Sequence, residues 1–411
     1  PPSYTFFQRS LRKSGENSRY PTRRSIVKFQ NGHLAYCTNI HPAETWQETW
    51  NVLKKHTLAV RDKLISPCSQ HQATGYAIGL RLSAVAAEEL LADDNLQKFQ
   101  QWLTEENCYV FTINGFPYGS FHGTRVKEKV YQPDWTSSER LNYTNNLFEI
   151  IARLVPENID GSVSTLPGSF KEFNAIEADI FKNLEACAQQ IEALSKKHNR
   201  DLHLGLEPEP LGHFENTEET LAFFERFLNT VDDPDIIKRR IGINYDTCHF
   251  ALEFDDCHQS LNALRAAGLR ISKVHLSSAL EFDPTSEQAL EKIKDFDEPT
   301  YLHQVIIKDN DGSLTRFKDL PDFHSSRSTP HYSREARVHF HIPLYTEPET
   351  PLGSTNNHAM DALSYLKQHS DFCTHFEIET YTWGVLPSNL QIPIEDQIAK
   401  EYDWVLQGHT D

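Results

Sequence analysis

The most informative segment of this sequence is 241–249, which reads Ile241-Gly242-Ile243-Asn244-Tyr245-Asp246-Thr247-Cys248-His249. Its first residues form a β-rich apolar run that ends at the acid Asp246, and His249 follows three residues later. In parallel α/β proteins, the side chains that perform chemistry lie at the carboxyl ends of the strands. The segment therefore predicts a buried strand with a candidate functional site at its end.

Other segments carry a polar side chain at the corresponding place. In 202–207, leucines alternate with His203, Gly205 and Glu207, so the leucines are expected to face helices and Glu207 to point inward at the strand end. The segment 374–381 repeats this scheme, with Glu379 in the position equivalent to Glu207. Between them, the segment 271–277 carries His275 near its end.

The whole chain alternates short β-rich runs with amphipathic helical stretches, which is typical of parallel α/β folds. Eight strands are predicted, the number that a closed barrel needs, at 33–40, 74–82, 108–114, 160–165, 202–208, 240–246, 271–277 and 374–381. Helices are predicted at 44–63, 83–104, 138–154, 172–198, 217–230, 259–267, 357–368 and 394–407. We therefore expect one (β/α)8 TIM barrel over 31–411, preceded by a basic arm over 1–30.

The interval 279–356 interrupts the alternation. A turn signal at 309–313 between two β-rich runs predicts a hairpin, and a further β-like run spans Arg337–Leu344. We interpret the interval as a long insertion between strands 7 and 8, on the face where barrel enzymes build their sites. Two interpretations stay open, a lid over the site and a decoration without a role.

The composition excludes several classes of protein. The 411 residues are 38% hydrophobic and 24% charged, which is ordinary for a globular chain that buries a large core. No run of eighteen apolar residues and no signal-peptide pattern occurs, so no membrane association is expected. The formal net charge of −18 argues against nucleic acid as a partner, because phosphate backbones are bound by clustered Lys and Arg.

The cysteines and the basic arm bear on the compartment. Seven scattered cysteines without a Cys-x-x-Cys pair predict neither a disulfide framework nor a thiolate zinc site, so a reducing compartment, the cytoplasm, is expected. Residues 1–28 carry seven basic residues against one acid. We expect a solvated tail there, with organelle import as the alternative. The sequence leaves the oligomeric state open, including a homo-oligomer.

Four inward residues at consecutive strand ends form a candidate metal site. They are Glu207, Asp246, His275 and Glu379. This set of three carboxylates and one imidazole suits Mn²⁺, Mg²⁺ or Co²⁺ and is acceptable to Zn²⁺. Each residue alone is more often a solvated, ion-paired or hydrogen-bonded group than a ligand, so the prediction depends on their matched positions.

These residues resemble those of a known superfamily. The run Asp246-Thr247-Cys248-His249, with Glu207-Pro208 before it and Val274-His275-Leu276 after it, is similar to the xylose-isomerase-like barrels, which include ketose 3-epimerases and AP-endonuclease-type enzymes. The resemblance implies that Glu207, Asp246, His275 and Glu379 bind one catalytic divalent metal. It also implies that His249 binds substrate or a further metal.

A closer resemblance covers nearly the whole chain after the arm. It is to the EboE-type metabolite traffic proteins, which accompany enzymes that modify or export a small molecule. The runs that carry it are 34–42, 114–118, 207–210 and 379–383, and they include Glu207-Pro208-Glu209-Pro210 and Glu379-Thr380-Tyr381-Thr382-Trp383. This resemblance implies the fold and a metabolite pathway but no defined reaction.

The sequence departs from the nuclease branch of the superfamily. That branch uses three metals, an Asp-x-His motif after strand seven and a histidine on strand two, whereas this chain has His339-Phe340-His341 and no histidine in 75–82. A full trinuclear site is therefore not expected. His249, His341, His339 and His122 are candidates for a second metal or for substrate, and a polar strand lining a loop is the alternative for the 339/341 pair.

Polar and aromatic residues follow several strands and predict a substrate mouth. Amides bond hydroxyl groups and aromatic rings stack on C–H surfaces, as polyols and sugars require, although each such residue alone is more often structural. Lys127 and Lys129 are weaker candidates for binding a phosphate, as in a sugar phosphate. The candidates for substrate binding are His41, Asn39, Asn114, Tyr118 and Trp383.

Three functions are compatible with these residues. The first is a metal-dependent isomerase or epimerase of a sugar, cyclitol or related hydroxy-carbonyl compound, with Glu207 and Glu379 as general base and acid. In that reaction the metal lowers the pKa of the C–H beside the carbonyl. The second is a hydrolase or phosphodiesterase that uses two metals to activate water. The third is a carrier that binds a metabolite without transforming it.

Overall fold

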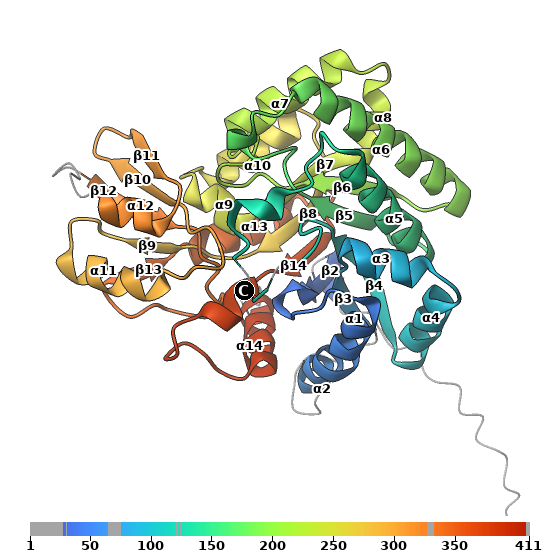
Figure 1. Ribbon diagram of the computed structural model, residues 1–411, viewed down its shortest axis with the longest axis horizontal. Helices are drawn as coiled ribbons and strands as arrows, with labels where there is room; N and C mark the ends of the chain where they lie inside the picture. The colour runs from blue at the N-terminus through green and yellow to red at the C-terminus, as the bar shows by residue number, and fades with distance from the viewer. Residues whose placement is uncertain are drawn as a thin grey trace, which may run out of the picture.

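Eight parallel strands form a nearly closed barrel in the computed structural model, which describes residues 28–29, 31–64, 75–120, 122–123, 125–326 and 333–407 (Figure 1). The strand order is β2-β14-β8-β7-β6-β5-β4-β3, and a bridge between Cys37 and Gly79 joins the two edges. The predicted single barrel is confirmed. Most of the predicted basic arm lies outside the described residues.

The barrel strands fall within or close to the predicted ranges. A short β1 (Lys28–Phe29) pairs antiparallel with β2. The eight strands are β2 (Gly32–Tyr36), β3 (Tyr76–Arg81), β4 (Cys108–Asn114), β5 (Gly161–Thr165), β6 (Leu202–Leu206), β7 (Ile241–Asp246), β8 (Ile271–Leu276) and β14 (His375–Ile378).

Helices cover the outside of the barrel (Figure 1). Leu204, Ile243 and Val274 are fully buried beneath them, and each side chain contributes about 1.5–3 kcal/mol through burial. A π-helical turn at Leu53–Thr57 joins α1 to α2. The helices are α1 (Trp46–Val52), α2 (Leu58–Leu64), α3 (Ala84–Leu91), α4 (Asn95–Glu105), α5 (Ser138–Leu154), α6 (Glu177–His198), α7 (Thr217–Thr230), α8 (Pro234–Arg240), α9 (Thr247–Leu252), α10 (Cys257–Ala266), α13 (Asn356–Gln368) and α14 (Ile394–Gln407).

Gly79 of β3 allows the barrel to close tightly against β2. A Cβ atom at this position would lie 2.1 Å from Oε1 of Glu377 and 2.6 Å from the carbonyl oxygen of Tyr36. Because one of these atoms belongs to the backbone, a larger side chain would push the strands apart. The glycine therefore leaves room for the carboxylate of Glu377 in the barrel interior.

The insertion between β8 and β14 folds into a lobe beside the barrel, coloured orange in Figure 1. It is a five-stranded antiparallel sheet in the order β11-β10-β12-β9-β13. Phe282, Ile293 and Phe340 belong to a separate apolar core. Its elements are β9 (Leu280–Phe282), α11 (Glu287–Lys292), β10 (Val305–Asp309), β11 (Leu314–Phe317), α12 (Leu320–Ser325), β12 (Ser333–Val338) and β13 (Leu352–Ser354).

The predicted hairpin in the insertion is confirmed as the β10–β11 pair. The strand predicted at Arg337–Leu344 is wrong in its bounds, because β12 ends at Val338. Beyond that residue the backbone bonds to loops, with His339 N donating to Gln304 O at 2.9 Å and Ile342 N to Ser278 O at 3.0 Å. Within the described residues, no helix combines the length and apolar character needed to cross a bilayer.

Candidate metal centre

Glu207, Asp246, His275 and Glu379 converge at the carboxyl end of the barrel. Each offers one ligand atom, and these atoms all lie within 4.8 Å of one another. Nδ1 of His275 is 3.1 Å from Oε1 of Glu207, 3.6 Å from Oδ2 of Asp246 and 3.4 Å from Oε2 of Glu379. All four side chains are buried, as expected of groups held around a common point.

The two glutamates occupy equivalent places in the backbone ladder. Glu207 N donates to Thr165 O at 2.9 Å, and Glu379 N donates to Leu276 O at 3.0 Å. Each residue thus continues the parallel pairing one step past its strand, which directs its side chain into the barrel mouth. The strand-end alternation read from the sequence has the same geometric origin.

Asp246 has one oxygen engaged and one free to bind a ligand. Its Oδ1 accepts from Cys248 N at 2.8 Å, His249 N at 3.1 Å and Ser277 Oγ at 2.6 Å, so it caps α9. Its buried Oδ2 has no hydrogen-bond partner among the described residues. A buried carboxylate oxygen without a partner is costly, and a cation would satisfy it.

Neighbouring amides orient the two glutamates. Asn39 and Asn114 both donate to Oε1 of Glu379, at 2.8 and 3.3 Å, and Asn244 donates to Oε2 of Glu207 at 2.8 Å. In each case the other oxygen, Oε2 of Glu379 or Oε1 of Glu207, faces His275. Metal ligands are typically held in a fixed orientation by hydrogen bonds from neighbouring groups of this kind.

A second charged layer lies below His275. Glu377 Oε2 is 2.9 Å from His275 Nε2 and 2.5 Å from Lys273 Nζ, and all three side chains are fully buried. Burial alone would lower the pKa of His275, but the carboxylates of Glu379 and Glu207 outweigh it and raise that pKa well above its usual value. Burial, together with the charges of Glu207 and Asp246, raises the pKa of Glu379 well above its usual value. Carboxylate groups outnumber cationic side chains in this cluster, so the donor set fits a divalent metal ion.

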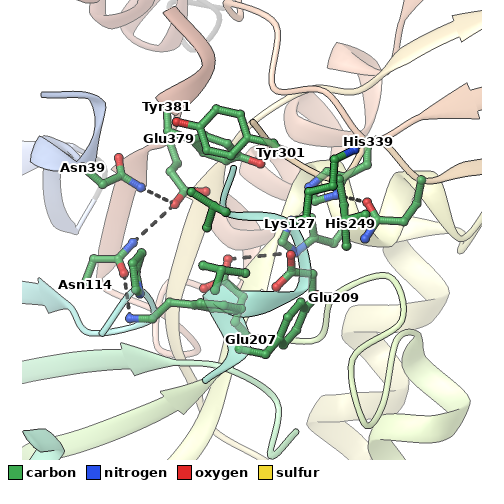
Figure 2. Close-up of a pocket in the computed structure, with 17 residues that line it drawn as sticks. Asn39, Asn114, Lys127, Glu207, Glu209, His249, Tyr301, His339, Glu379 and Tyr381 are labelled. Atoms are coloured by element: carbon green, nitrogen blue, oxygen red, sulfur yellow. Dashed lines mark hydrogen bonds and ion pairs between the residues drawn. The ribbon is translucent and has the colours of Figure 1, made fainter. Parts of the chain in front are cut away.

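A pocket opens beside this cluster, with an empty volume of about 560 Å³ (Figure 2). Glu207 and Glu379 line it, whereas Asp246 and His275 lie behind them. The other polar lining residues include Asn39, Asn114, Lys127, Glu209, His249, Tyr301, Gln304, His339 and Tyr381. The two glutamates are therefore the candidate ligands that a small molecule in the pocket would meet.

The insertion forms part of the pocket wall. Tyr301, Leu302, Gln304 and His339 come from it. Thr300 O accepts from the backbone N–H groups of Val126 and Lys127, which tie the insertion to the loop across the pocket. The ammonium group of Lys127, considered from the sequence as a phosphate ligand, is ion-paired with Asp319 of the insertion.

Three imidazoles converge beside Asp246. In each ring Nδ1 is placed to donate to an oxygen: His249 to Pro208 O at 2.9 Å, His341 to Glu379 O at 2.9 Å and His339 to Gln304 Oε1 at 2.7 Å. The three Nε2 atoms are buried and have no hydrogen-bond partner within the described ranges. Nδ1–H tautomers with unused Nε2 lone pairs are the arrangement of metal-binding histidines.

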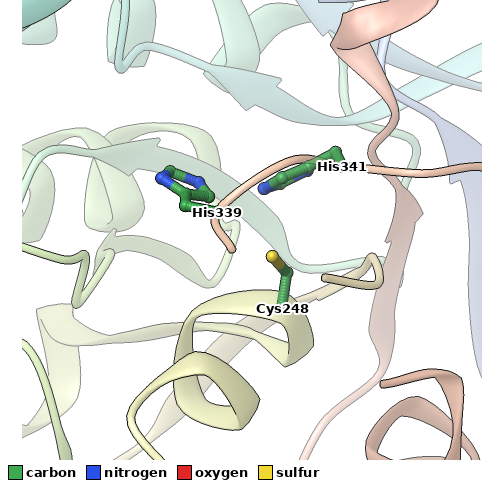
Figure 3. Close-up of side chains that lie close together, drawn as sticks. All are labelled: Cys248, His339 and His341. Carbon is green, nitrogen blue, oxygen red and sulfur yellow. The ribbon is translucent and has the colours of Figure 1, made fainter. Parts of the chain in front are cut away.

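Further donors surround these rings. One ion could be reached by Asp246, His249 and His341 together, and another arrangement joins Glu209, His249 and His339. The thiol of Cys248 is directed toward His339 and His341 (Figure 3). Burial and the charge of Glu207 raise the pKa of Glu209 well above its usual value. Asp246 belongs both to the set with His249 and His341 and to the set with Glu207, His275 and Glu379. The two candidate metal sites therefore lie next to each other.

The remaining predicted residues have varied positions. Asn39 and Asn114 line the pocket, whereas His41, Tyr118 and Trp383 do not. His41 bonds Tyr36 and stacks on His56, Tyr118 packs on Tyr143, and Trp383 donates to Ile392 O. His122 lies apart from the three histidines, with Nε2 2.5 Å from Asn39 O and Nδ1 2.9 Å from the hydroxyl of Tyr301.

Several site residues were not selected from the sequence. Lys273 and Asn244 each lie two positions before a predicted ligand on the same strand, so the two-residue period could have identified them. Glu209 is in the quoted Glu-Pro-Glu-Pro run, but it follows the strand in a loop. Gln304 and Tyr301 carry no local signal, because their place depends on how the insertion packs.

No protein-family model matches the sequence, and comparison with curated proteins gives no significant match. Solved structures align along most of the chain. The IOLI protein with a bound zinc atom is 14% identical, with a TM-score of 0.47, and the alignment covers 92% of this chain and 99% of that one. A D-tagatose 3-epimerase-like protein is 11% identical, with a TM-score of 0.47 and coverages of 91% and 96%.

The 3-keto-D-glucoside 4-epimerase YcjR of E. coli is 12% identical, with a TM-score of 0.43 and coverages of 91% and 98%. A xylose isomerase domain protein of Salmonella typhimurium is 10% identical, with a TM-score of 0.41 and coverages of 93% and 98%. The solved structures similar to this chain thus include xylose isomerase-like barrel proteins and sugar epimerases. The assignment of the barrel to this chain rests on its own strand pairing.

Proposed function

We propose that the protein is a divalent-metal-dependent isomerase or epimerase of a small hydroxy-carbonyl compound such as a sugar or cyclitol. The observation that carries the proposal is the convergence of Glu207, Asp246, His275 and Glu379, with only the two glutamates lining the pocket. When bound there, a cation such as Mn²⁺, Mg²⁺, Co²⁺ or Zn²⁺ supplies Lewis-acid polarisation of a carbonyl group.

The two glutamates then exchange protons with the substrate. One carboxylate removes the proton from the carbon beside the carbonyl, and the electron pair of that C–H bond moves toward the carbonyl oxygen. The other carboxyl group returns a proton, either to the opposite face of the same carbon or to its neighbour. Asn39 and Asn114 hold Glu379, and Asn244 holds Glu207, so neither group must reorient between the steps.

The pocket wall supports a polyol as substrate. The amides of Asn39 and Asn114 can bond hydroxyl groups, and Tyr301 and Tyr381 present aromatic faces. The insertion contributes Tyr301 to this wall, and we propose that it acts as a lid that excludes water from the reacting carbon. The likeness to EboE-type proteins supports a place in a pathway that modifies or exports a metabolite.

Solvent-deuterium exchange tests the proposal. The full chain, stripped with a chelator and reloaded with Mn²⁺, Mg²⁺, Co²⁺ or Zn²⁺, is incubated in D₂O with a panel of ketoses and cyclitol ketones. We expect deuterium at the carbon beside the carbonyl of one compound, and a loss of exchange of roughly 10²–10⁴-fold in Glu207→Gln and in Glu379→Gln. Glu139→Gln, on the outer helix α5, is the matched control and should retain full exchange. Undiminished exchange in both site variants would contradict the assignment.

The second candidate is a hydrolase with two metals, which the three unused Nε2 atoms favour. A second cation, held by His249 either with Asp246 and His341 or with Glu209 and His339, would activate a water molecule. Two metals per chain, about 3.5–4 Å apart, with phosphodiesterase activity would support it. One metal per chain at this end of the barrel with solvent exchange supports the isomerase. Biological activity retained in the double variant of Glu207 and Glu379 would leave only a carrier.

A further inference from the structure

The amino end of the barrel holds another group of potential metal ligands. It lies at the opposite end of the strands from Glu207 and Glu379. Asp160 precedes β5, His203 is on β6 and His375 begins β14, and their donor atoms all lie within 4.8 Å of one another. His203 and His375 are buried, whereas the side chain of Asp160 is 23% exposed. None of these residues takes part in the proposed reaction.

The hydrogen bonds of His375 determine which of its nitrogens carries a proton. Nδ1 of His375 lies 2.8 Å from the hydroxyl oxygen of Ser162. That hydroxyl donates its own proton to Thr112 Oγ1 at 2.7 Å. The proton between His375 and Ser162 must therefore belong to Nδ1, so Nε2 of the neutral ring carries a lone pair.

This lone pair lies beside a carboxylate. Nε2 of His375 is 3.2 Å from Oδ1 of Asp160 and forms no hydrogen bond within the described residues. Nε2 of His203 is 3.1 Å from the other oxygen, Oδ2, and can donate a hydrogen bond to it. A metal ion would replace that proton at Nε2, and the ring would then carry its proton on Nδ1, which has no hydrogen-bond partner among the described residues. A lone pair and a carboxylate oxygen this close repel each other unless a cation lies near both. Two ligands of one metal ion, each about 2.0–2.2 Å from it, are separated by roughly 3.0–3.4 Å, so both observed distances match the spacing of ligands of one ion.

We infer that Asp160, His203 and His375 form a binding site for a transition-metal ion at the amino end of the barrel. Two imidazoles with one carboxylate favour Zn²⁺, Co²⁺, Ni²⁺ or Fe²⁺ over Mg²⁺, which prefers oxygen ligands. The donor set therefore differs from the carboxylate-rich centre at the other end. The two sites are therefore expected to differ in their relative affinities for Mg²⁺ and Zn²⁺.

The surroundings allow an ion to enter and be held. Asp160 and Thr374 line a surface cavity with an empty volume of about 860 Å³, so water can complete the coordination. Thr374 Oγ1 donates to Oδ1 of Asp160 at 3.3 Å, and Arg270 donates to Oδ2 at 3.1 Å. Arg270 also bonds Asp201 at 2.8 Å, which balances part of its charge. These donors orient the carboxylate, as partners of metal ligands do.

Metal stoichiometry tests the inference. The purified full chain is stripped, titrated with Zn²⁺ in excess Mg²⁺, passed through a desalting column and subjected to elemental analysis. We expect His375→Gln and Asp160→Asn each to bind one equivalent of Zn²⁺ fewer than the parent chain. Co²⁺ in place of Zn²⁺ should give a visible absorption band that both variants reduce.

The matched control is His33→Gln. His33 also lies at the amino end of the barrel, with its ring centroid 6.4 Å from that of His375. Its Nδ1 forms a hydrogen bond with the hydroxyl of Tyr109 instead. We expect this variant to bind as many equivalents of Zn²⁺ as the parent chain. If His375→Gln does not fold, Asp160→Asn decides, because its partly exposed amide keeps the acceptor for Thr374. Unchanged stoichiometry in the folded variants, or ¹⁵N shifts of an imidazolium at His375 in zinc-saturated protein, would overturn the inference, because a proton would then be the cation.

Discussion

Asp246→Asn is the most decisive change at the carboxyl-end cluster. The amide oxygen can keep the three hydrogen bonds that Oδ1 accepts and so preserve the cap of α9. The other position, where Oδ2 has no partner, becomes an NH₂ group that cannot bind a cation. The substitution therefore removes a ligand while it leaves the fold in place.

The expected loss can be expressed as a change in thermal stability. Removing a partner of a metal ligand costs about 10–100-fold in affinity, so losing the ligand itself should cost about 100-fold or more. At a metal concentration 100 times the parent dissociation constant, binding stabilises the parent by about 2.7 kcal/mol and a variant weakened 100-fold by about 0.4 kcal/mol. With an unfolding entropy of about 2.1 cal/mol/K per residue over 411 residues, metal should raise the parent Tm by about 3 °C and the variant Tm by about 0.5 °C.

Differential scanning calorimetry with and without Mn²⁺ measures this difference. The matched control is Asp256→Asn, which makes the same chemical change at the cap of α10, where Asp256 accepts from Gln259 N at 2.8 Å. The control should keep the full metal-dependent rise. An equal rise in Asp246→Asn and in the parent chain would show that Asp246 is not a ligand.

Three further outcomes are expected. Burial raises the pKa of Glu401 to about 7, so between pH 4.5 and pH 7 this group is protonated in the folded chain and ionised in the unfolded chain, and stability falls as pH rises through this range. In urea denaturation, Glu401→Gln should gain about 2.5 kcal/mol over the parent between pH 5 and pH 8, and a pH-independent difference would contradict this. Lys273→Met leaves the buried charge of Glu377 without its ammonium partner and should lower the free energy of unfolding by about 3–5 kcal/mol, much of it restored by Glu377→Gln. Gln304→Leu removes the acceptor that fixes the tautomer of His339, so affinity for a second metal should fall about 10–100-fold with the first metal retained.

The sequence predicted the barrel because its signals are local. A period of two residues fixes which side chains of a strand face inward, and an acid or histidine at a strand end must then reach the carboxyl-end face. For this reason the amino-acid sequence alone was enough to select Glu207, Asp246, His275 and Glu379 together. Their role as ligands stays a prediction.

The rest depends on contacts between distant segments. The hairpin of the insertion has a turn signal, but the pairing of β12 with β9 and of β9 with β13 joins short strands far apart in sequence. The strand-end rule gives the face on which a residue lies but not its distance from the barrel axis. His41 and Trp383 therefore lie at the carboxyl end of the barrel, as predicted, but their side chains turn away from the pocket. His41 forms a hydrogen bond with Tyr36, and Trp383 donates one to the carbonyl oxygen of Ile392.

The insertion and the three histidines have a common consequence under the two-metal proposal. His339 and His341 are on the insertion side, whereas His249 and Asp246 belong to the barrel. The Nε2 atoms of the three histidines are buried and have no hydrogen-bond partner within the described residues, which is unfavourable for the contact between the two parts. A cation bound by both sides would satisfy these atoms and cross-link the insertion to the barrel, which would hold Tyr301 at the pocket wall. Occupation of the second site and closure of the pocket would then be one event, and loss of that metal would both open the pocket and remove the activated water.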